Sequence, residues 1–488
     1  MSGFSKRITP SRRWFRRIIV GVVMFLVTTF VGRWIWWERT RAEGEKELAA
    51  ALAETDALDP RWRWEQIEED RPEIPDAENS IFIVKQIDQS KEKSDRGWTE
   101  LPDGKQLLPV VNDNYRFDNE RISFIRMKLN EHESIVQLAR SLKDYPRGRA
   151  RLDVQPVTIN TSLAHTQACR VPAGILSLEI ERLLHDRNVN KVWDPVRAIL
   201  HAGAALRGEG SLISQLVRMA LRAIAARRVE RIFAMAEPRV VELKAMQSHL
   251  ANEELEELYI VAMRGERAMF TIFFENLASR RISLDDVGDG PNQLKSLYGR
   301  LGWKLYEARL PDDEAHYIRT MNYLISIADL PPHEHLKKND EFESRFRSQA
   351  WRDKEDKVRL ITTLMFPATN KVVEAAVRDK AILRCAITAI AAERFRIASN
   401  KWPTRLDDLC PNYLDRPLLD PFDGEVLKYT IRDDGVTIYS VGADGQDNGG
   451  SNLTSTGKEK NADLGFRLWN VDQRGQPAAP KQMEDKQP

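Results

Sequence analysis

An apolar run near the N-terminus constrains this chain more than any other feature of its sequence. Residues 18–32, IIVGVVMFLVTTFVG, carry no charge, and residues 34–37, WIWW, continue the apolar character. The resulting segment of about 20 residues has the length that an α-helix needs to cross the hydrocarbon core of a bilayer. Arg33 is its single charge, and a side chain so close to the end reaches the headgroups. The sequence therefore predicts a transmembrane helix at residues 18–37, with the lipid bilayer as its partner.

The charges that flank this segment predict its orientation. Six positive charges and no acidic residue precede residue 18. Because such basic flanks stay on the cytoplasmic side, we expect residues 1–17 to be a basic cytoplasmic segment of a single-pass protein in the bacterial inner (cytoplasmic) membrane. The bulk of the chain is then periplasmic or otherwise extracytoplasmic.

There are two alternatives to an uncleaved anchor. A cleaved signal peptide is disfavoured because bulky Trp and Arg residues follow the apolar run, where small residues are needed. Export by the twin-arginine route is suggested by residues 11–15, SRRWF, although Arg16 stands where that signal has an apolar residue. We expect a signal-anchor, and the choice between Sec and twin-arginine export stays open.

Charge and cysteine content exclude some partners. The 488 residues have a net charge of +1, and removing the six N-terminal positive charges leaves −5 for the rest. A slightly acidic body lacks the basic surface of a nucleic-acid-binding protein, so no nucleic-acid partner is expected. Cys169, Cys385 and Cys410 form no CxxC motif and no Cys/His cluster. They are expected to be buried small hydrophobes, with a Cys385–Cys410 disulfide as the alternative in an exported chain.

The segment between the anchor and the body is predicted to be a spacer. Residues 38–78 are rich in charge and contain several prolines, which predicts a juxtamembrane helix followed by a linker. Trp62 and Trp64 lie within this linker, and we expect them to dock it onto the body.

Residues 79–370 carry mainly helical periodicity and are predicted to form a helical ectodomain, an antiparallel array of helices. The clearest helix runs from Ser211 to Glu237, where apolar residues recur on one face. Its arginines are expected to point outward or to lie at the rim; they are Arg218, Arg222, Arg227 and Arg228. Further helices are predicted at residues 252–277 and 298–330.

No familiar catalytic motif occurs in this region. The sequence contains no GxSxG, no P-loop and no GxGxxG. The segment 333–335, HEH, follows two prolines and is expected to be a solvated loop, and residues 208–210, GEG, are expected to be a turn between helices. An enzyme built from residues far apart in the sequence, such as a hydrolase, stays open as an alternative, because catalytic triads are recognised by geometry.

The C-terminal part changes its period from helix to strand. A long helix is predicted from Lys371 to Ser399, and a short helix after Thr404. Strands follow at residues 427–432 and 436–441, joined by a hairpin turn at residues 433–435, DDG. The fold class is therefore mainly α with a C-terminal α+β unit.

The order of these pieces resembles a known family. Residues 391–409, the run 411–429 that contains LLDPFDGE, and the loop YSVGADGQDNGG at 439–450 resemble the C-terminal half of the type II secretion major pseudopilin. Residues 460–464, KNADL, stand where that family has a later Asn/Asp-Ala-Asp segment. The resemblance implies a pilin-like domain at residues 371–470, a small antiparallel sheet with a long helix, which leaves 471–488 as a disordered tail.

In that family the glycine-rich loop wraps a calcium ion. The resemblance implies that Asp444 and Asp463 are side-chain ligands, that Asn461 is another, and that the carbonyl of Val441 completes the shell. Calcium takes six to eight oxygen ligands in loose geometry, which suits such a loop. The alternative is a glycine loop that holds no metal. The N-terminus lacks the family's processing site, so assembly into a pseudopilus is not expected.

These features together favour a membrane-anchored cell-envelope structural or interaction protein with a pseudopilin-like domain that calcium stabilises. Envelope proteins are its expected partners, and no enzymatic activity is expected. The alternatives are an envelope hydrolase with a site in the helical region and an accessory protein of a secretion system.

Overall fold

The computed structural model describes residues 12–90, 107–108, 114–283, 286, 306–350, 359–365, 369–450, 453–454 and 462–478. The chain forms two compact units. One comprises Met1–Pro60, Thr271–Thr320 and Gln349–Phe366, and the other comprises Arg61–Phe270, Met321–Ser348 and Pro367–Pro488. Both units are discontinuous in sequence.

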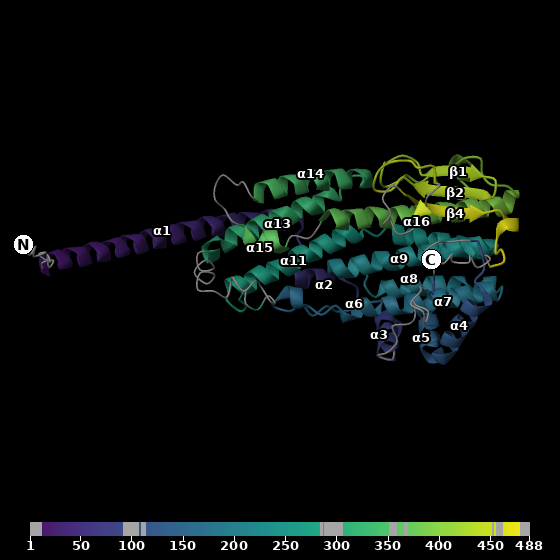
Figure 1. The fold of residues 1–488 in the computed structure, drawn as a ribbon, viewed down its shortest axis with the longest axis horizontal. Helices are drawn as coiled ribbons and strands as arrows, with labels where there is room; N and C mark the ends of the chain where they lie inside the picture. The colour runs from purple at the N-terminus through teal and green to yellow at the C-terminus, as the bar shows by residue number, and fades with distance from the viewer. Residues whose placement is uncertain are drawn as a thin grey trace, which may run out of the picture. The chain divides into compact units, whose positions relative to one another are not determined.

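Helices dominate the described part of the chain (Figure 1). Their bounds are α1 (Arg12–Leu58), α2 (Trp64–Asp70), α3 (Ser80–Ser90), α4 (Asn119–Glu131), α5 (Glu133–Ser141), α6 (Ala164–Ala168), α7 (Arg170–His185), α8 (Trp193–Ala204), α9 (Leu212–Met235), α10 (Val240–Glu254), α11 (Leu258–Ala278), α13 (Leu310–Ile327), α14 (Pro332–Ala350), α15 (Leu360–Met365) and α16 (Thr369–Ser399). The predicted mainly helical fold class with a small C-terminal sheet is therefore confirmed.

In the first unit, the second half of α1 packs against α13. Ala51 of α1 is buried with Ala315 and Ile318 of α13. On the flank of this contact, Arg319 binds Glu47 and Glu54 at 2.9 and 3.0 Å. The helix expected after the apolar run is thus continuous with it.

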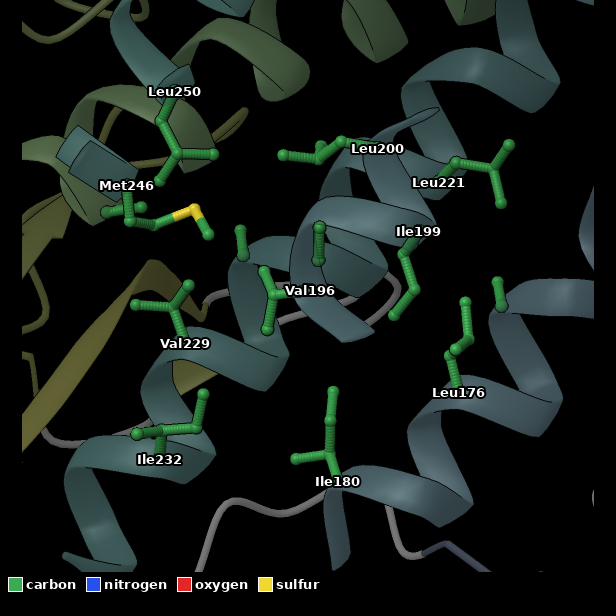
Figure 2. Close-up of a cluster of buried hydrophobic side chains, with 14 of the residues drawn as sticks. Leu176, Ile180, Val196, Ile199, Leu200, Leu221, Val229, Ile232, Met246 and Leu250 are labelled. Atoms are coloured by element: carbon green, nitrogen blue, oxygen red, sulfur yellow. The ribbon is translucent and has the colours of Figure 1, made fainter. Parts of the chain in front are cut away.

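The core of the second unit lies among α7, α8, α9 and α10. Figure 2 shows the side chains of these helices pointing toward one another, with Ile180 of α7, Val196 of α8, Val229 of α9 and Met246 of α10 among them. Of these four, Ile180, Val196 and Val229 are completely buried. Trp62 is also completely buried and Trp64 nearly so, which confirms that the tryptophans dock the segment after α1 onto the body.

A small sheet completes the second unit. It has the order β1-β2-β4-β3, with β1 (Lys428–Arg432), β2 (Gly435–Ser440), β4 (Asp463–Trp469) and the short β3 (Leu453–Thr454). The β1–β2 and β2–β4 pairs are antiparallel, and β3 pairs in parallel with β4. The helices α16 and α9 pack against the sheet, and α16 runs beside it in Figure 1.

The arginines of α9 correct one sequence prediction. Arg218, Arg222 and Arg228 are 1%, 2% and 8% exposed, so they do not point outward. Arg222 binds Glu253 of α10 at 2.8 Å and Asp379 of α16 at 2.9 Å. A buried guanidinium is tolerated when carboxylates pair with it, and these partners lie on helices distant in sequence.

Other predictions need correction at their boundaries. The helix predicted at residues 252–277 is broken between α10 and α11. The segment 333–335 lies in the first turn of α14, where His335 is 7% exposed and its Nε2 lies 2.7 Å from the Leu330 carbonyl. It is therefore not a solvated loop.

The start of the predicted tail is packed. Arg474 is 9% exposed and pairs with Glu393 of α16 at 2.8 Å. Residues 479–488, the rest of that segment, lie outside the described residues. Cys169, Cys385 and Cys410 are free thiols; Cys169 and Cys385 are buried as expected, and Cys410 is half-buried.

Candidate functional site

The first candidate surface is the apolar half of α1. From residue 16 onward this helix is long and apolar enough to span a membrane, and the most apolar window of its sequence is 0% buried. Phe25 and Phe30 are 67% and 72% exposed. Toward the end of the run, the Arg309 guanidinium lies 5.6 Å from the centre of the Trp36 ring, within the same unit. The helix therefore presents a side-chain surface that water solvates poorly.

The second candidate is the loop after β2, from Val441 to Gly450. Asp420, which is 1% exposed, holds its first residues. The Asp420 carboxylate accepts hydrogen bonds from the Ser440 hydroxyl at 2.7 Å and from the Val441 backbone N–H at 2.8 Å. The sequence resemblance did not assign a role to Asp420, although its place in the DPFDG turn was the available signal.

Asp463, at the start of β4, holds the end of the same loop. Its carboxylate is completely buried and accepts the backbone N–H of Gly450 at 2.7 Å and of Asn448 at 3.2 Å. Burial raises the pKa of Asp463, and the nearby Asp447 and Asp444 raise it further. Gly450 has φ of 60°, and a Cβ there would lie 2.8 Å from the Tyr439 ring, so no larger residue fits.

The four predicted calcium ligands are placed differently from one another. Asp444 is exposed, and its Oδ1 accepts the Gln446 N–H at 3.1 Å. Val441 is 1% exposed, and Asn461 lies outside the described residues. Among the described residues, no three carboxylate, imidazole or thiolate side chains come together in a metal-binding group.

The donor chemistry of the loop still suits a hard cation. Each ionised carboxylate oxygen has two lone pairs, so Asp463 keeps acceptor capacity after it binds the two amides. Asp444 and Asp447 lie close enough for their charge to act on Asp463, so the loop concentrates negative charge. Calcium prefers this kind of oxygen-rich, glycine-bent loop.

A third cluster surrounds the predicted turn at residues 208–210. Glu209 is completely buried, and both of its carboxylate oxygens lie 3.0 Å from His165 Nε2. Ser214 donates its hydroxyl proton to Glu209, and it lies 3.0 Å from the Thr166 hydroxyl. The Thr166 hydroxyl also lies 3.3 Å from His165 Nε2, so two hydroxyls, an imidazole and a buried carboxylate form one hydrogen-bonded cluster.

Cys169 lies near this cluster. Burial and the negative charge of Glu209 raise the pKa of the Cys169 thiol, which keeps it protonated. The cluster therefore joins the turn before α9 to α6.

Comparison with known proteins found no match for this chain. No protein-family model matches this chain, and no curated protein or solved structure matches it.

Proposed function

We propose that this chain is a single-pass, membrane-anchored structural or interaction protein of the bacterial cell envelope. The apolar half of α1 crosses the inner membrane with residues 1–17 inside, and the two folded units lie on the outer side, where they bind other envelope proteins. The observation that supports this proposal is that no part of the most apolar window of α1 is buried.

The energetics of that surface support a lipid environment. Burying one large apolar side chain stabilises by about 1.5–3 kcal/mol. Moving the exposed apolar side chains between Ile18 and Trp36 from water into lipid would therefore gain a free energy on the order of 20 kcal/mol. A helix of this kind satisfies its own backbone hydrogen bonds and needs no further partner to enter hydrocarbon.

Membrane extraction tests the anchor. The full chain is expected to remain in the membrane pellet after washes with high salt and alkaline carbonate, and to be released by detergent. The double variant Leu26→Arg/Phe30→Arg should shift protein to the soluble fraction, because a central arginine costs about 2.5–3.5 kcal/mol. Leu58→Arg, in the same helix but outside the apolar run, should behave as wild type. Release of the wild type by salt alone contradicts the proposal.

We further propose that the C-terminal unit is pseudopilin-like and that calcium stabilises its loop. The arrangement of α16 over an antiparallel sheet supports the likeness, and the loop that Asp420 and Asp463 hold at its two ends supports the metal. Asp444, Asp463 and the Val441 carbonyl would be ligands, with Asn461. A bound cation would neutralise the loop's concentrated negative charge.

A calcium titration tests this second proposal. Calcium at millimolar concentration should raise the melting temperature, since a ligand that binds the folded state stabilises it by RT ln(1 + [L]/Kd). Asp444→Ala should abolish the rise, whereas Asp407→Ala, at an exposed acid of the same unit, should leave it unchanged. The absence of any rise in the wild type contradicts the proposal.

A further inference from the structure

An open groove of about 560 Å³ lies in the second unit between α10, α16 and the segment 412–418. One face of α10 lines it from Lys244 to Leu255. Because an α-helix rises 1.5 Å per residue, this wall is about 16 Å long. Ile387 and Arg394 of α16 and the segment 412–418 form the rest of the lining.

The contacts between α10 and α16 show which residues lie at each end of the groove. Arg394 binds Gln247 at 2.6 Å, and Arg384 binds Glu254 at 2.7 Å, so α10 and α16 run antiparallel beside it. Arg394 therefore lies at the end nearer Lys244. At the opposite end, Leu255 is 72% exposed beside the ion pair of Glu254 and Arg384.

The groove carries cationic groups that lack acidic partners. The Arg394 guanidinium lies 5.3 Å from the centre of the Tyr413 ring, and its buried Nε has no hydrogen-bond partner. Lys244 is exposed at the same end, and Arg416 is exposed on the 412–418 segment. Among the described residues, none of these three cations forms an ion pair.

The acidic residues of the lining do not cancel this charge. Glu254 is already neutralised by Arg384, which leaves Asp415 as the acid without an ion pair among the described lining residues. Three unpaired cations against one unpaired anion give the groove an excess of positive charge, on a body whose net charge is otherwise negative. The groove is thus complementary to an anionic ligand.

We propose that this groove binds an extended acidic segment of a partner protein, with carboxylates at the Arg394 end and an apolar side chain at the Leu255 end. An extended chain advances about 3.3 Å per residue, so the groove accommodates about five residues. Guanidinium and ammonium groups bind carboxylates with charge-assisted hydrogen bonds, and the exposed side chains of Lys244 and Arg416 supply such donors. This inference rests on the proposed interaction function and names the class of partner.

Peptide binding to the full-length protein in detergent micelles tests the inference. The probe is acetyl-Asp-Asp-Gly-Ser-Leu-Leu with a neutral fluorophore, followed by anisotropy. It should bind saturably and about tenfold more tightly than the matched Lys-Lys-Gly-Ser-Leu-Leu peptide, a difference of about 1.4 kcal/mol. Raising the salt concentration should weaken the acidic peptide selectively, because the exposed charges are screened.

Variants locate the site. Lys244→Gln/Arg416→Gln removes two exposed cations and should weaken the acidic peptide about tenfold. Leu255→Ser should weaken binding of the acidic peptide, because its two leucines lose an apolar contact. Lys401→Gln removes an exposed charge of the same unit outside the groove and should bind as wild type.

Three results overturn the inference: no saturable binding of the acidic peptide at millimolar concentration, equal binding of the acidic and basic peptides, or equal losses in the groove and Lys401→Gln variants. Displacement of the peptide by succinate at equal concentration also overturns it, in favour of a small dicarboxylate ligand. All of these outcomes leave the membrane-extraction result unchanged, so failure of this inference is distinguishable from failure of the anchor.

Discussion

Glu314, on α13, is a carboxyl group in an unfavourable environment. It is 5% exposed. Burial, with the negative charges of Glu275 and Asp313, raises the pKa of Glu314 to about 8. The folded first unit therefore holds a proton on Glu314 at a pH where the unfolded chain would release it.

This pKa predicts a loss of stability as the pH rises. The unfolded carboxyl ionises near pH 4.5, so between about pH 4.5 and pH 8 stability should fall by up to about 1.4 kcal/mol per pH unit from this group. Glu314→Gln removes the ionisation and should be more stable than wild type at about pH 8, but similar at about pH 4.5. Thermal unfolding across this range measures the effect, with Asp329→Asn, an exposed acid of the other unit, as the control. If the melting temperatures of wild type and Glu314→Gln change in parallel with pH, the raised pKa of Glu314 is contradicted.

Gly265 of α11 lies where the packing leaves no space for a side chain. A Cβ at Gly265 would collide with the backbone of Gly210, which cannot move as a side chain can. Gly265→Ala should therefore destabilise the protein by about 2–3 kcal/mol. Gly203→Ala, in α8, is the matched control, because its Cβ would meet its nearest neighbour at 3.5 Å and alanine favours a helix. The midpoint of urea unfolding should be lower for Gly265→Ala than for Gly203→Ala. Equal midpoints would contradict the close approach of Gly265 to the Gly210 backbone.

At the scale of elements, the ion cluster of α9, α10 and α16 makes a further prediction. Burial opposes the charge of Glu253, yet Arg218, Arg222 and Arg207 hold its pKa down to about 2. Replacing Arg222 by Met leaves the buried Asp379 carboxylate without its hydrogen-bonded cation, which costs about 3–5 kcal/mol.

The double variant Arg222→Met/Asp379→Leu tests whether this cost arises from the unpaired carboxylate. It should recover part of the stability lost in Arg222→Met, because replacing both members of a buried pair by apolar residues removes the unpaired charge. Chemical denaturation of both variants gives the comparison. A double variant no more stable than Arg222→Met contradicts this explanation.

Elements with a strong local period were predictable from the sequence. The helices at Leu212–Met235 and Thr369–Ser399 match their predicted ranges within two residues, since their apolar residues recur at helical spacing. The burial of Arg218 and Arg222 was not predictable, because their acidic partners lie tens of residues away or more. The break between α10 and α11 and the strand β4 were also missed, since neither carries a proline or hairpin turn at its boundary.

The candidate sites divide in the same way. The apolar surface of α1 follows from composition alone, whereas the roles of Asp420 and Asp463 depend on contacts across the sheet. The groove beside α10 is invisible in the sequence, because its cations come from three separate segments and are distinguished only by lacking acidic partners.

At the scale of the whole molecule, the proposed calcium binding and envelope partners depend on the side of the membrane that the folded units occupy. Calcium at millimolar concentration and envelope partners are available only outside the cytoplasm. Basic residues before the apolar run of α1 favour that topology, and the apolar window of the helix provides the span.

Reporter fusions after Pro488 measure this topology most directly. Alkaline phosphatase, which is active only after export, should be active at that position, and green fluorescent protein, which folds in the cytoplasm, should be dark. The same reporters fused before Met1 should give the reverse pattern. A fluorescent C-terminal fusion with an inactive phosphatase would contradict the central claim that the body of this protein lies outside the cytoplasm.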